Sequence, residues 1–253
     1  MSSWTWANAS VVGTSHIKVG ARKQDAVRCF SSSEDKSFLV SIVSDGAGSA
    51  PFGGEGASLS CWLIGNAVSH HLDRIKTLPT EEDFLAWVDC VRDALFVAAS
   101  KRNCSVRDFA ATFLLCVSNG MSTFTAQIGD GCIVLRDDEQ KKWFVPNWPD
   151  HGEYASTTYF ITDEVKVKYS VSRLDTPIQG VVMFSDGLER LALDFSNHEP
   201  HSGFFDGVYQ PVLSSGEIGK DLILSKALST FLANDNICSR TDDDKTLVVA
   251  VCK

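Results

Sequence analysis

The chain has 253 residues, of which 44% are hydrophobic and 22% are charged, a balance typical of a folded globular protein and not of a disordered one. It has 23 basic and 32 acidic residues, and no basic cluster is interleaved with aromatic residues, so nucleic acid is not an expected partner. No apolar run approaches the ~18 residues of a membrane span. Residues 1–10 lack the regions of a signal peptide, so we expect a cytoplasmic protein without membrane partners.

The first half of the chain predicts two strands followed by two helices. Strands are expected at residues 27–30 and 38–43, and the second runs into the glycine-rich sequence Ser-Asp-Gly-Ala-Gly. Apolar side chains at helical spacing predict a helix over about residues 53–72. A second helix is expected to begin near Thr80, because Thr80 and Asp83 have the spacing of a capping box and precede an apolar face.

The rest of the chain is dominated by strand patterns. Asn119 and Gly120 predict a two-residue hairpin between strands at 109–117 and 123–128. The later expectations are strands at 132–135 and 143–145, a loop at 146–158, a strand at 181–184, a short helix after Gly187, a polar loop from 197 to about 211, a helix near 217–232 and a strand at 246–251.

No linker, low-complexity segment or internal repeat divides the chain, so we expect residues 1–253 to form a single domain. Antiparallel sheets with helices packed outside them fit the element order best. Two facing sheets account for the number of strands. The predicted fold is therefore α+β, a sandwich of two facing antiparallel β-sheets flanked by helices.

An apolar strand runs directly into Asp-Gly at three places, Asp45, Asp130 and Asp186, and the acids at 242–244 directly precede the apolar sequence TLVVAV. Each pair taken alone is ordinary turn chemistry. Strand ends of a sandwich can meet at one rim, however, and carboxylates gathered there repel one another unless cations neutralise them. Such hard oxygen ligands suit Mg²⁺ or Mn²⁺, and an adjacent glycine lets its backbone carbonyl approach as a further ligand.

Five segments, in order along essentially the whole chain, resemble the type 2C (PPM) metal-dependent protein phosphatases of the compact bacterial kind. They are GTSHIKVGARKQDA, SDGAGSAPFGGEGA, IGDG, FSDGL and DDDKTLVVAV. The resemblance implies a hydrolase that removes phosphate from serine and threonine residues of phosphoproteins. Its expected partners are phosphorylated proteins, with a cognate protein kinase among them.

The resemblance also implies a set of metal ligands. In the family, two ions share a bridging aspartate, which here is Asp45, and the carbonyl of Gly46 binds one of them. Asp186 and Asp243 are implied as ligands of the other ion. Asp243 is chosen among its acidic neighbours because it stands three positions before Thr246, the D-x-x-T spacing of the family.

Two further aspartates match family positions. Asp130, together with Asp186, resembles the ligands of a third, weaker metal site, and Asp25 matches the aspartate that binds a metal-bound water. Two ions ~3.5–4 Å apart lower the pKa of a water between them and stabilise an in-line displacement at phosphorus. The implied mechanism is direct attack by water without a covalent phosphoenzyme.

Three positions depart from the family pattern. Gly20 stands where an arginine is frequent, which leaves Arg22 and His16 as candidates to contact phosphate. Ala47 replaces a histidine that is proposed as general acid in some eukaryotic members, so protonation of the leaving group falls to His16 or to metal-bound water. A structural role for His16 is the alternative. Gln24 replaces a frequent acid.

The alternative function is a catalytically weak phosphoprotein-binding or regulatory module of the same fold, suggested by Gly20 and Gln24. Retention of Asp45, Asp186 and Asp243 argues against it. A serine hydrolase is disfavoured because the chain has no G-x-S-x-G motif. Metal-stimulated release of phosphate distinguishes these functions.

Overall fold

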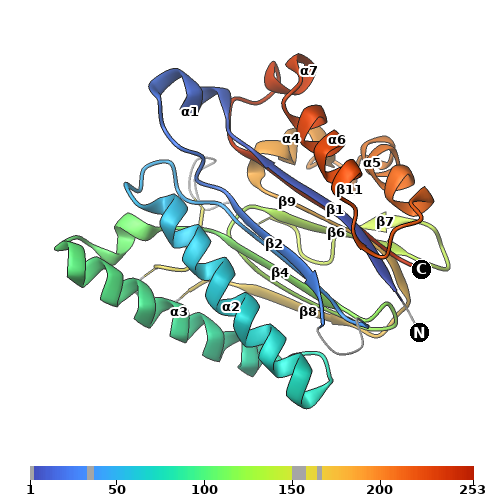
Figure 1. The fold of residues 1–253 in the computed structure, drawn as a ribbon, viewed down its shortest axis with the longest axis horizontal. Helices are drawn as coiled ribbons and strands as arrows, with labels where there is room; N and C mark the ends of the chain where they lie inside the picture. Colours follow the sequence, from blue (N-terminus) through green and yellow to red (C-terminus); the bar gives the residue numbers. More distant parts are fainter. Residues whose placement is uncertain (1–2, 33–36, 150–157, 164–166) are drawn as a thin grey trace.

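The computed structural model describes residues 3–32, 37–149, 158–163 and 167–253, and in these ranges two large β-sheets face each other (Figure 1). Two long helices, α2 (Gly53–Ile75) and α3 (Glu81–Arg102), cover the outer face of one sheet. The helices α5 (Ser202–Ser214) and α6 (Leu222–Leu232) cover the outer face of the other. The expected α+β sandwich is confirmed. No helix in the described ranges has the length and apolar character needed to cross a membrane.

The first sheet is antiparallel throughout and has the strand order β2-β3-β4-β5-β8. Its strands are β2 (Ala26–Ser31), β3 (Leu39–Ser44), β4 (Phe113–Ser118), β5 (Thr123–Ile128) and β8 (Ser170–Leu174). Every residue of β3, β4 and β5 is buried. These strands are covered on both faces, which agrees with the largely apolar sequences of β3 and β4, whereas β5 alternates apolar residues with Thr123, Thr125 and Gln127.

The second sheet has the order β12-β1-β13-β9-β6-β7 and is antiparallel except where β1 meets β12. Its strands are β1 (Trp4–Val11), β6 (Cys132–Asp137), β7 (Trp143–Phe144), β9 (Ile178–Phe184), β12 (Gly219–Lys220) and β13 (Lys245–Cys252). Between the sheets, Val43 and Leu114 of the first pack in one buried cluster with Met183 and Val248 of the second. This layer fixes how the strand ends of the two sheets meet.

The remaining elements are short. They are α1 (Thr14–Val19), the 3₁₀ helices η1 (Val106–Phe109) and η2 (Asp186–Leu188), α4 (Glu189–Ala192), α7 (Asp235–Cys238) and the small hairpin of β10 (Leu193–Asp194) and β11 (Glu199–Pro200). The capping box predicted before α3 is confirmed. The Thr80 hydroxyl accepts a hydrogen bond from the Asp83 N–H, and the Asp83 carboxylate accepts one from the Thr80 N–H.

The prediction of a polar loop from 197 to about 211 is wrong, because helix α5 occupies most of it. The helix contains Gly203, Gly207 and Pro211, all residues of low helix propensity. Phe205, Tyr209 and Val212 recur at helical spacing and are buried against the second sheet. Their packing outweighs the low helix propensity of the intervening residues. The next helix, expected near 217–232, begins at Leu222 because Asp221 caps it.

The hairpin after β4 also differs from its prediction. Ser118 pairs with Thr123, so the loop has four residues and not two. The Asn119 side-chain oxygen accepts hydrogen bonds from the N–H groups of Met121 and Ser122, which closes the turn. Strands β1 and β8 were not predicted. Of the loop expected at 146–158, residues 150–157 lie outside the described ranges.

Candidate functional site

Four aspartates from separate parts of the chain meet at one pocket of about 240 Å³. Asp45 follows β3, Asp130 lies between β5 and β6, Asp186 begins η2 directly after β9, and Asp243 stands just before β13. The rest of the lining consists of Gln24, Gly46, Ala47, Gly48, Ser49, Thr112, Thr158 and Phe160. The strand ends that the sequence marked with aspartates therefore converge at one rim of the sandwich, and the pocket draws on both sheets.

The carboxylates disturb one another's ionisation. Burial, and then the neighbouring charges of Asp25 and Asp186, raise the pKa of Asp45 well above its usual value. Burial, followed by the charge of Asp130, raises the pKa of Asp186 to about 7. Glu189 lies close enough to be affected as well, since burial and the charges of Asp130 and Asp186 raise its pKa to about 8. The site is built to receive positive charge.

Asp25 is buried behind the pocket and is fixed by two hydroxyl groups. Its Oδ2 accepts hydrogen bonds from Ser185 Oγ at 2.8 Å and from Thr246 Oγ1 at 2.6 Å. Thr246 also lies 2.7 Å from Ser10 Oγ, to which the Lys23 ammonium donates. Burial raises the pKa of Asp25 in spite of these hydrogen bonds. Its other oxygen, Oδ1, is buried and has no hydrogen-bond partner among the described residues.

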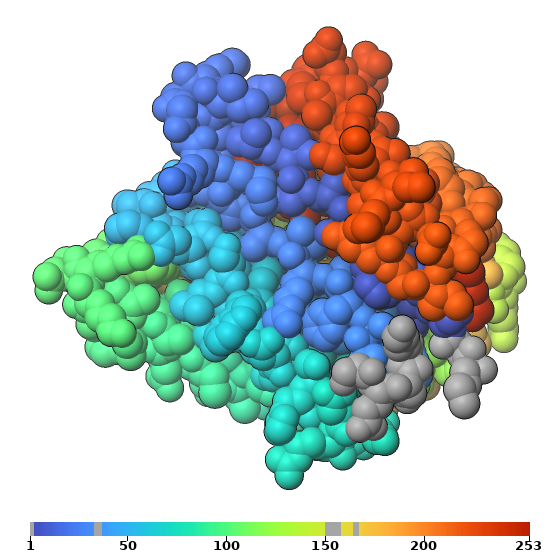
Figure 2. Space-filling model, viewed as in Figure 1, coloured from blue at the N-terminus to red at the C-terminus, as the bar shows by residue number. Residues whose placement is uncertain are grey.

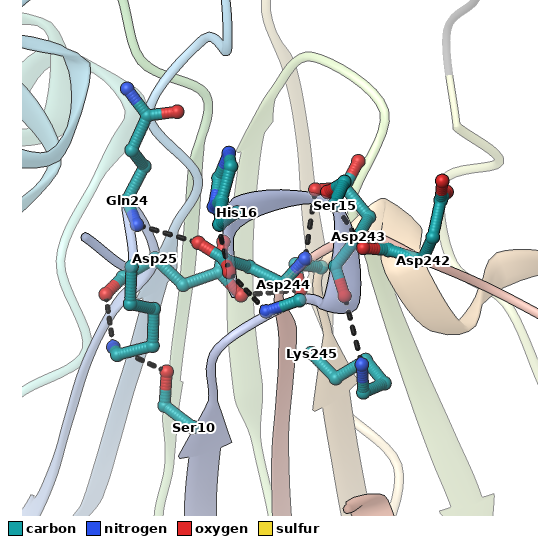
Figure 3. Close-up of polar contacts among 12 residues, drawn as sticks. Ser10, Ser15, His16, Gln24, Asp25, Asp242, Asp243, Asp244 and Lys245 are labelled. Carbon is teal, nitrogen blue, oxygen red and sulfur yellow. Dashed lines mark hydrogen bonds and ion pairs between the residues drawn. The ribbon is translucent and has the colours of Figure 1, made fainter. Parts of the chain in front are cut away.

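The three consecutive acids before β13 have three different surroundings (Figure 3). Asp244 is buried, and its carboxylate accepts hydrogen bonds from the N–H groups of Gly13 and Gln24. Asp242 is exposed, and its backbone carbonyl accepts hydrogen bonds from the backbone and the hydroxyl of Ser15. Asp243 alone of the three lines the pocket. The pocket therefore distinguishes Asp243 from its two neighbours by position, and its role as a metal ligand stays a prediction.

Neither of the two groups considered for phosphate contact lines the pocket. The Nδ1 atom of His16 lies 3.0 Å from Asp244 Oδ1, so this ring is attached to the acidic segment. Arg22 is exposed. Gly20 ends α1 with φ of 68°, a left-handed conformation that an arginine adopts only with strain. The departure from the family pattern at this position therefore has a local structural basis.

Two glycines allow the acidic segment to pack closely on its neighbours. A Cβ atom at Gly13 would lie 2.4 Å from the carbonyl carbon of Asp243, and one at Gly187 would lie 2.1 Å from the carbonyl oxygen of Asp244. No side chain fits at such distances without moving the backbone. The pocket wall at Asp243 is therefore held between α1 and η2.

Sequence reasoning missed the groups that hold Asp25 and Asp244. Ser185 and Thr246 were visible only as members of the FSDGL and D-x-x-T patterns, with no role of their own. Glu189 was also missed, although it follows FSDGL directly. His198, Glu199 and His201 are exposed and do not line the pocket.

The donors in the pocket suit a hard divalent cation. Asp186 Oδ1 and Asp25 Oδ1 are buried without a hydrogen-bond partner in the described ranges, and burial, followed by the neighbouring carboxylates, raises the pKa of Asp45 and Asp186. Within the same ranges, no three acidic, histidine or cysteine side chains form a ready-made ligand set for one ion. Mg²⁺ commonly takes one or two carboxylates and keeps several waters, so the arrangement fits that ion.

Comparisons of the amino-acid sequence with known proteins identify one family. Residues 12–233 match the family model described as Protein phosphatase 2C. The chain is 38% identical over 259 residues to Serine/threonine-protein phosphatase 3 of Escherichia coli (strain K12), covering 98% of each protein.

Solved structures share the fold at low sequence identity. The S. agalactiae serine/threonine phosphatase matches with a TM-score of 0.59 at 15% identity, covering 98% of this chain and 99% of that one. RsbX in complex with magnesium matches with a TM-score of 0.58 at 12% identity, covering 97% and 94%. Taken with the family model and the sequence relative, they show that this chain belongs to the protein phosphatase 2C family of phosphoprotein phosphatases.

Proposed function

We propose that this protein releases phosphate from phosphoserine and phosphothreonine residues of proteins with the help of Mg²⁺ or Mn²⁺ held at the carboxylate pocket. The observation that carries the proposal is the meeting of Asp45, Asp130, Asp186 and Asp243 in one pocket. The sequence relative from Escherichia coli is a serine/threonine-protein phosphatase, and a structural relative was crystallised with magnesium.

Each acid has a proposed task. Asp45 and the carbonyl of Gly46 would hold one ion, Asp45 with Asp186 and Asp243 would hold a second, and Asp130 with Asp186 would hold a third, weaker one. When bound, such ions lower the pKa of a water between them and stabilise the oxygens around phosphorus.

Asp25 sits behind this arrangement, and its Oδ1, which has no hydrogen-bond partner among the described residues, would accept a hydrogen bond from a water in the pocket. Arg22, which is exposed and separated by one residue from the pocket-lining Gln24, is proposed to meet the phosphate. For His16, the contact with Asp244 supports the structural alternative, in which the ring positions the segment that bears Asp243.

The alternative is a phosphoprotein-binding module without turnover. The retention of all four pocket acids favours the enzyme, because a binding module has no need to gather carboxylates against their repulsion.

The test is an assay of phosphate released from a phosphothreonine peptide by chelator-treated protein, before and after addition of Mn²⁺ or Mg²⁺. Asp243→Asn is expected to lower turnover by at least about 100-fold, since a ligand charge is lost. Asp242→Asn is the matched control, because Asp242 is the neighbour of Asp243 in sequence and its side chain is exposed. This variant is expected to remain active. Peptide binding without metal-stimulated release, in folded wild-type protein, would overturn the enzyme proposal in favour of the binding module.

A further inference from the structure

Residues 17–22, from the middle of α1 to the turn beyond it, form a run in which every residue is exposed. Ile17 is 60% exposed and Val19 is 77% exposed, and α1 has no buried residue. Single exposed apolar residues are common on proteins. Here two branched aliphatic side chains occur within one short helix that projects from the body of the molecule (blue, upper left in Figures 1 and 2).

This exposure does not come from a loose attachment. The Ser15 N–H and hydroxyl both donate to the Asp242 carbonyl, and His16 contacts the buried Asp244 carboxylate. The helix ends at Gly20, whose N–H donates to the carbonyl of Ile17. The helix is therefore fastened at its base while the side chains of Ile17 and Val19 face solvent.

The helix stands beside the mouth of the pocket. Its base is bonded to the segment that supplies Asp243, and the chain beyond it leads within four residues of Gly20 to Gln24, which lines the pocket. Figure 3 shows His16 between Gln24 and Asp243. A polypeptide whose phosphorylated side chain enters the pocket from this side would pass over α1.

The charge of this surface is opposite to that of the pocket. Residues 14–23 contain Lys18, Arg22 and Lys23 and no acidic residue, in a chain of net charge −9. Lys18 and Arg22 are exposed, whereas the Lys23 ammonium is directed to Ser10. The surface thus offers apolar contacts flanked by two cations, which complements a peptide that carries aliphatic and acidic side chains.

We propose that the α1 surface, formed by Ile17, Lys18, Val19 and Arg22, binds the segment of a substrate protein next to its phosphorylated residue. Aliphatic substrate side chains lie on Ile17 and Val19 and acidic ones face Lys18, while Arg22 keeps the phosphate contact proposed above. The proposal rests on the phosphatase function proposed above and adds a substrate class to it, namely phosphorylated segments that carry aliphatic and acidic neighbours.

The test compares two substrates in the metal-loaded enzyme, a phosphothreonine peptide flanked by leucine and glutamate and the small ester p-nitrophenyl phosphate. The double variant Ile17→Ser/Val19→Ser is expected to raise KM for the peptide about tenfold, because a modest apolar area is no longer buried on binding. Neither kcat nor KM for the ester is expected to change. The control Leu222→Ser/Ile223→Ser removes two side chains that are 72% and 82% exposed on α6. It is expected to leave KM and kcat unchanged for both substrates.

A charge exchange tests the electrostatic part. Lys18→Glu is expected to raise KM for the glutamate-flanked peptide and to lower it for a matched lysine-flanked peptide.

An unchanged peptide KM in all α1 variants would overturn the inference while leaving the phosphatase proposal intact. Equal losses of kcat/KM for the ester and the peptide would also overturn it, because α1 would then act by holding the pocket residues in place. Loss of binding to vesicles of anionic lipid with an unchanged peptide KM would assign the surface to a membrane instead. If wild-type protein released phosphate from neither substrate, the phosphatase proposal would fail first.

Discussion

The hydroxyl of Thr246 lies 2.6 Å from the Oδ2 atom of Asp25, a residue 221 positions earlier in the chain. Thr246 belongs to β13 of the second sheet, and Asp25 directly precedes β2 of the first. The contact therefore crosses from one sheet to the other, and with Ser185 it decides which carboxylate oxygen of Asp25 is left for the pocket.

Thr246→Val should lower turnover strongly while changing the stability of the fold only slightly. Valine keeps the shape and removes the donor, so Asp25 loses one of its two hydroxyl partners, and groups that orient active-site residues are commonly worth about 10–100-fold in activity. We expect kcat to fall by about that range with little change in KM. Thr246→Ser restores a hydroxyl and should recover most of the turnover. If valine and serine variants are equally active, Thr246 has no positioning role.

The metal-free protein should become less stable as pH rises. Asp186 has an ordinary pKa of 3.8 and a folded-state value of about 7. Between these values the folded chain holds a proton that the unfolded chain has released, so the free energy of unfolding falls as pH rises through that window.

This pH dependence can be measured as the melting temperature of chelator-treated protein from pH 5 to pH 8. For a chain of this size, each kcal/mol corresponds to ~2–4 °C. Asp186→Asn cannot titrate, so wild type should lose stability relative to this variant toward pH 8. Saturating Mn²⁺ should reverse the order, because only wild type keeps the full ligand set. A wild-type curve parallel to that of the variant would contradict the raised pKa.

Asp130→Ala separates the tight metal sites from the weaker one. Asp130 contributes the largest charge effect on Asp186, so its removal should lower the pKa of Asp186 and stabilise the metal-free protein. We expect turnover to fall about tenfold, while calorimetry still finds two tightly bound ions. Loss of either tight site would place Asp130 among their ligands.

Gly187→Ala tests the close packing on the acidic segment. Its Cβ would lie 2.1 Å from the Asp244 carbonyl oxygen, and forced shifts of this kind cost about 1–3 kcal/mol of stability. Gly207→Ala is the matched control, since a Cβ there has no atom within 4 Å. Within helix α5, alanine should be neutral or stabilising by up to about 1 kcal/mol. Thermal unfolding of both variants measures the difference, and equal melting temperatures would show that the segment accommodates a methyl group easily.

The sequence predicted the pocket acids because their signals are local. An apolar strand that runs into Asp-Gly is visible within six residues, and three of the four acids follow this pattern. The hydrogen bonds of Asp25 were not predictable in this way, since Ser185 lies 160 positions away and nothing near Ser185 marks its partner.

The missed elements have similar physical causes. Strand β1 contains Asn8 and Ser10 among its apolar residues, which weakens its pattern, although the strand pairs with β13 along its full length. Helix α5 contains glycines and Pro211, which read as loop residues, and only its packing on the second sheet makes it a helix. In both cases tertiary contacts decide a structure that local propensity leaves open.

The position of β13 between β1 and β9 has a consequence for synthesis of the protein. Of the strands in the described ranges, the ribosome delivers β1 first and β13 last, so β1 emerges into the cell long before its antiparallel partner β13 exists. Asp243 and Thr246 arrive with that late strand. A nascent chain that already carries Asp25, Asp45 and Asp186 therefore still lacks the segment that completes the pocket. We expect the protein to stay inactive during translation until β13 inserts into the middle of its sheet.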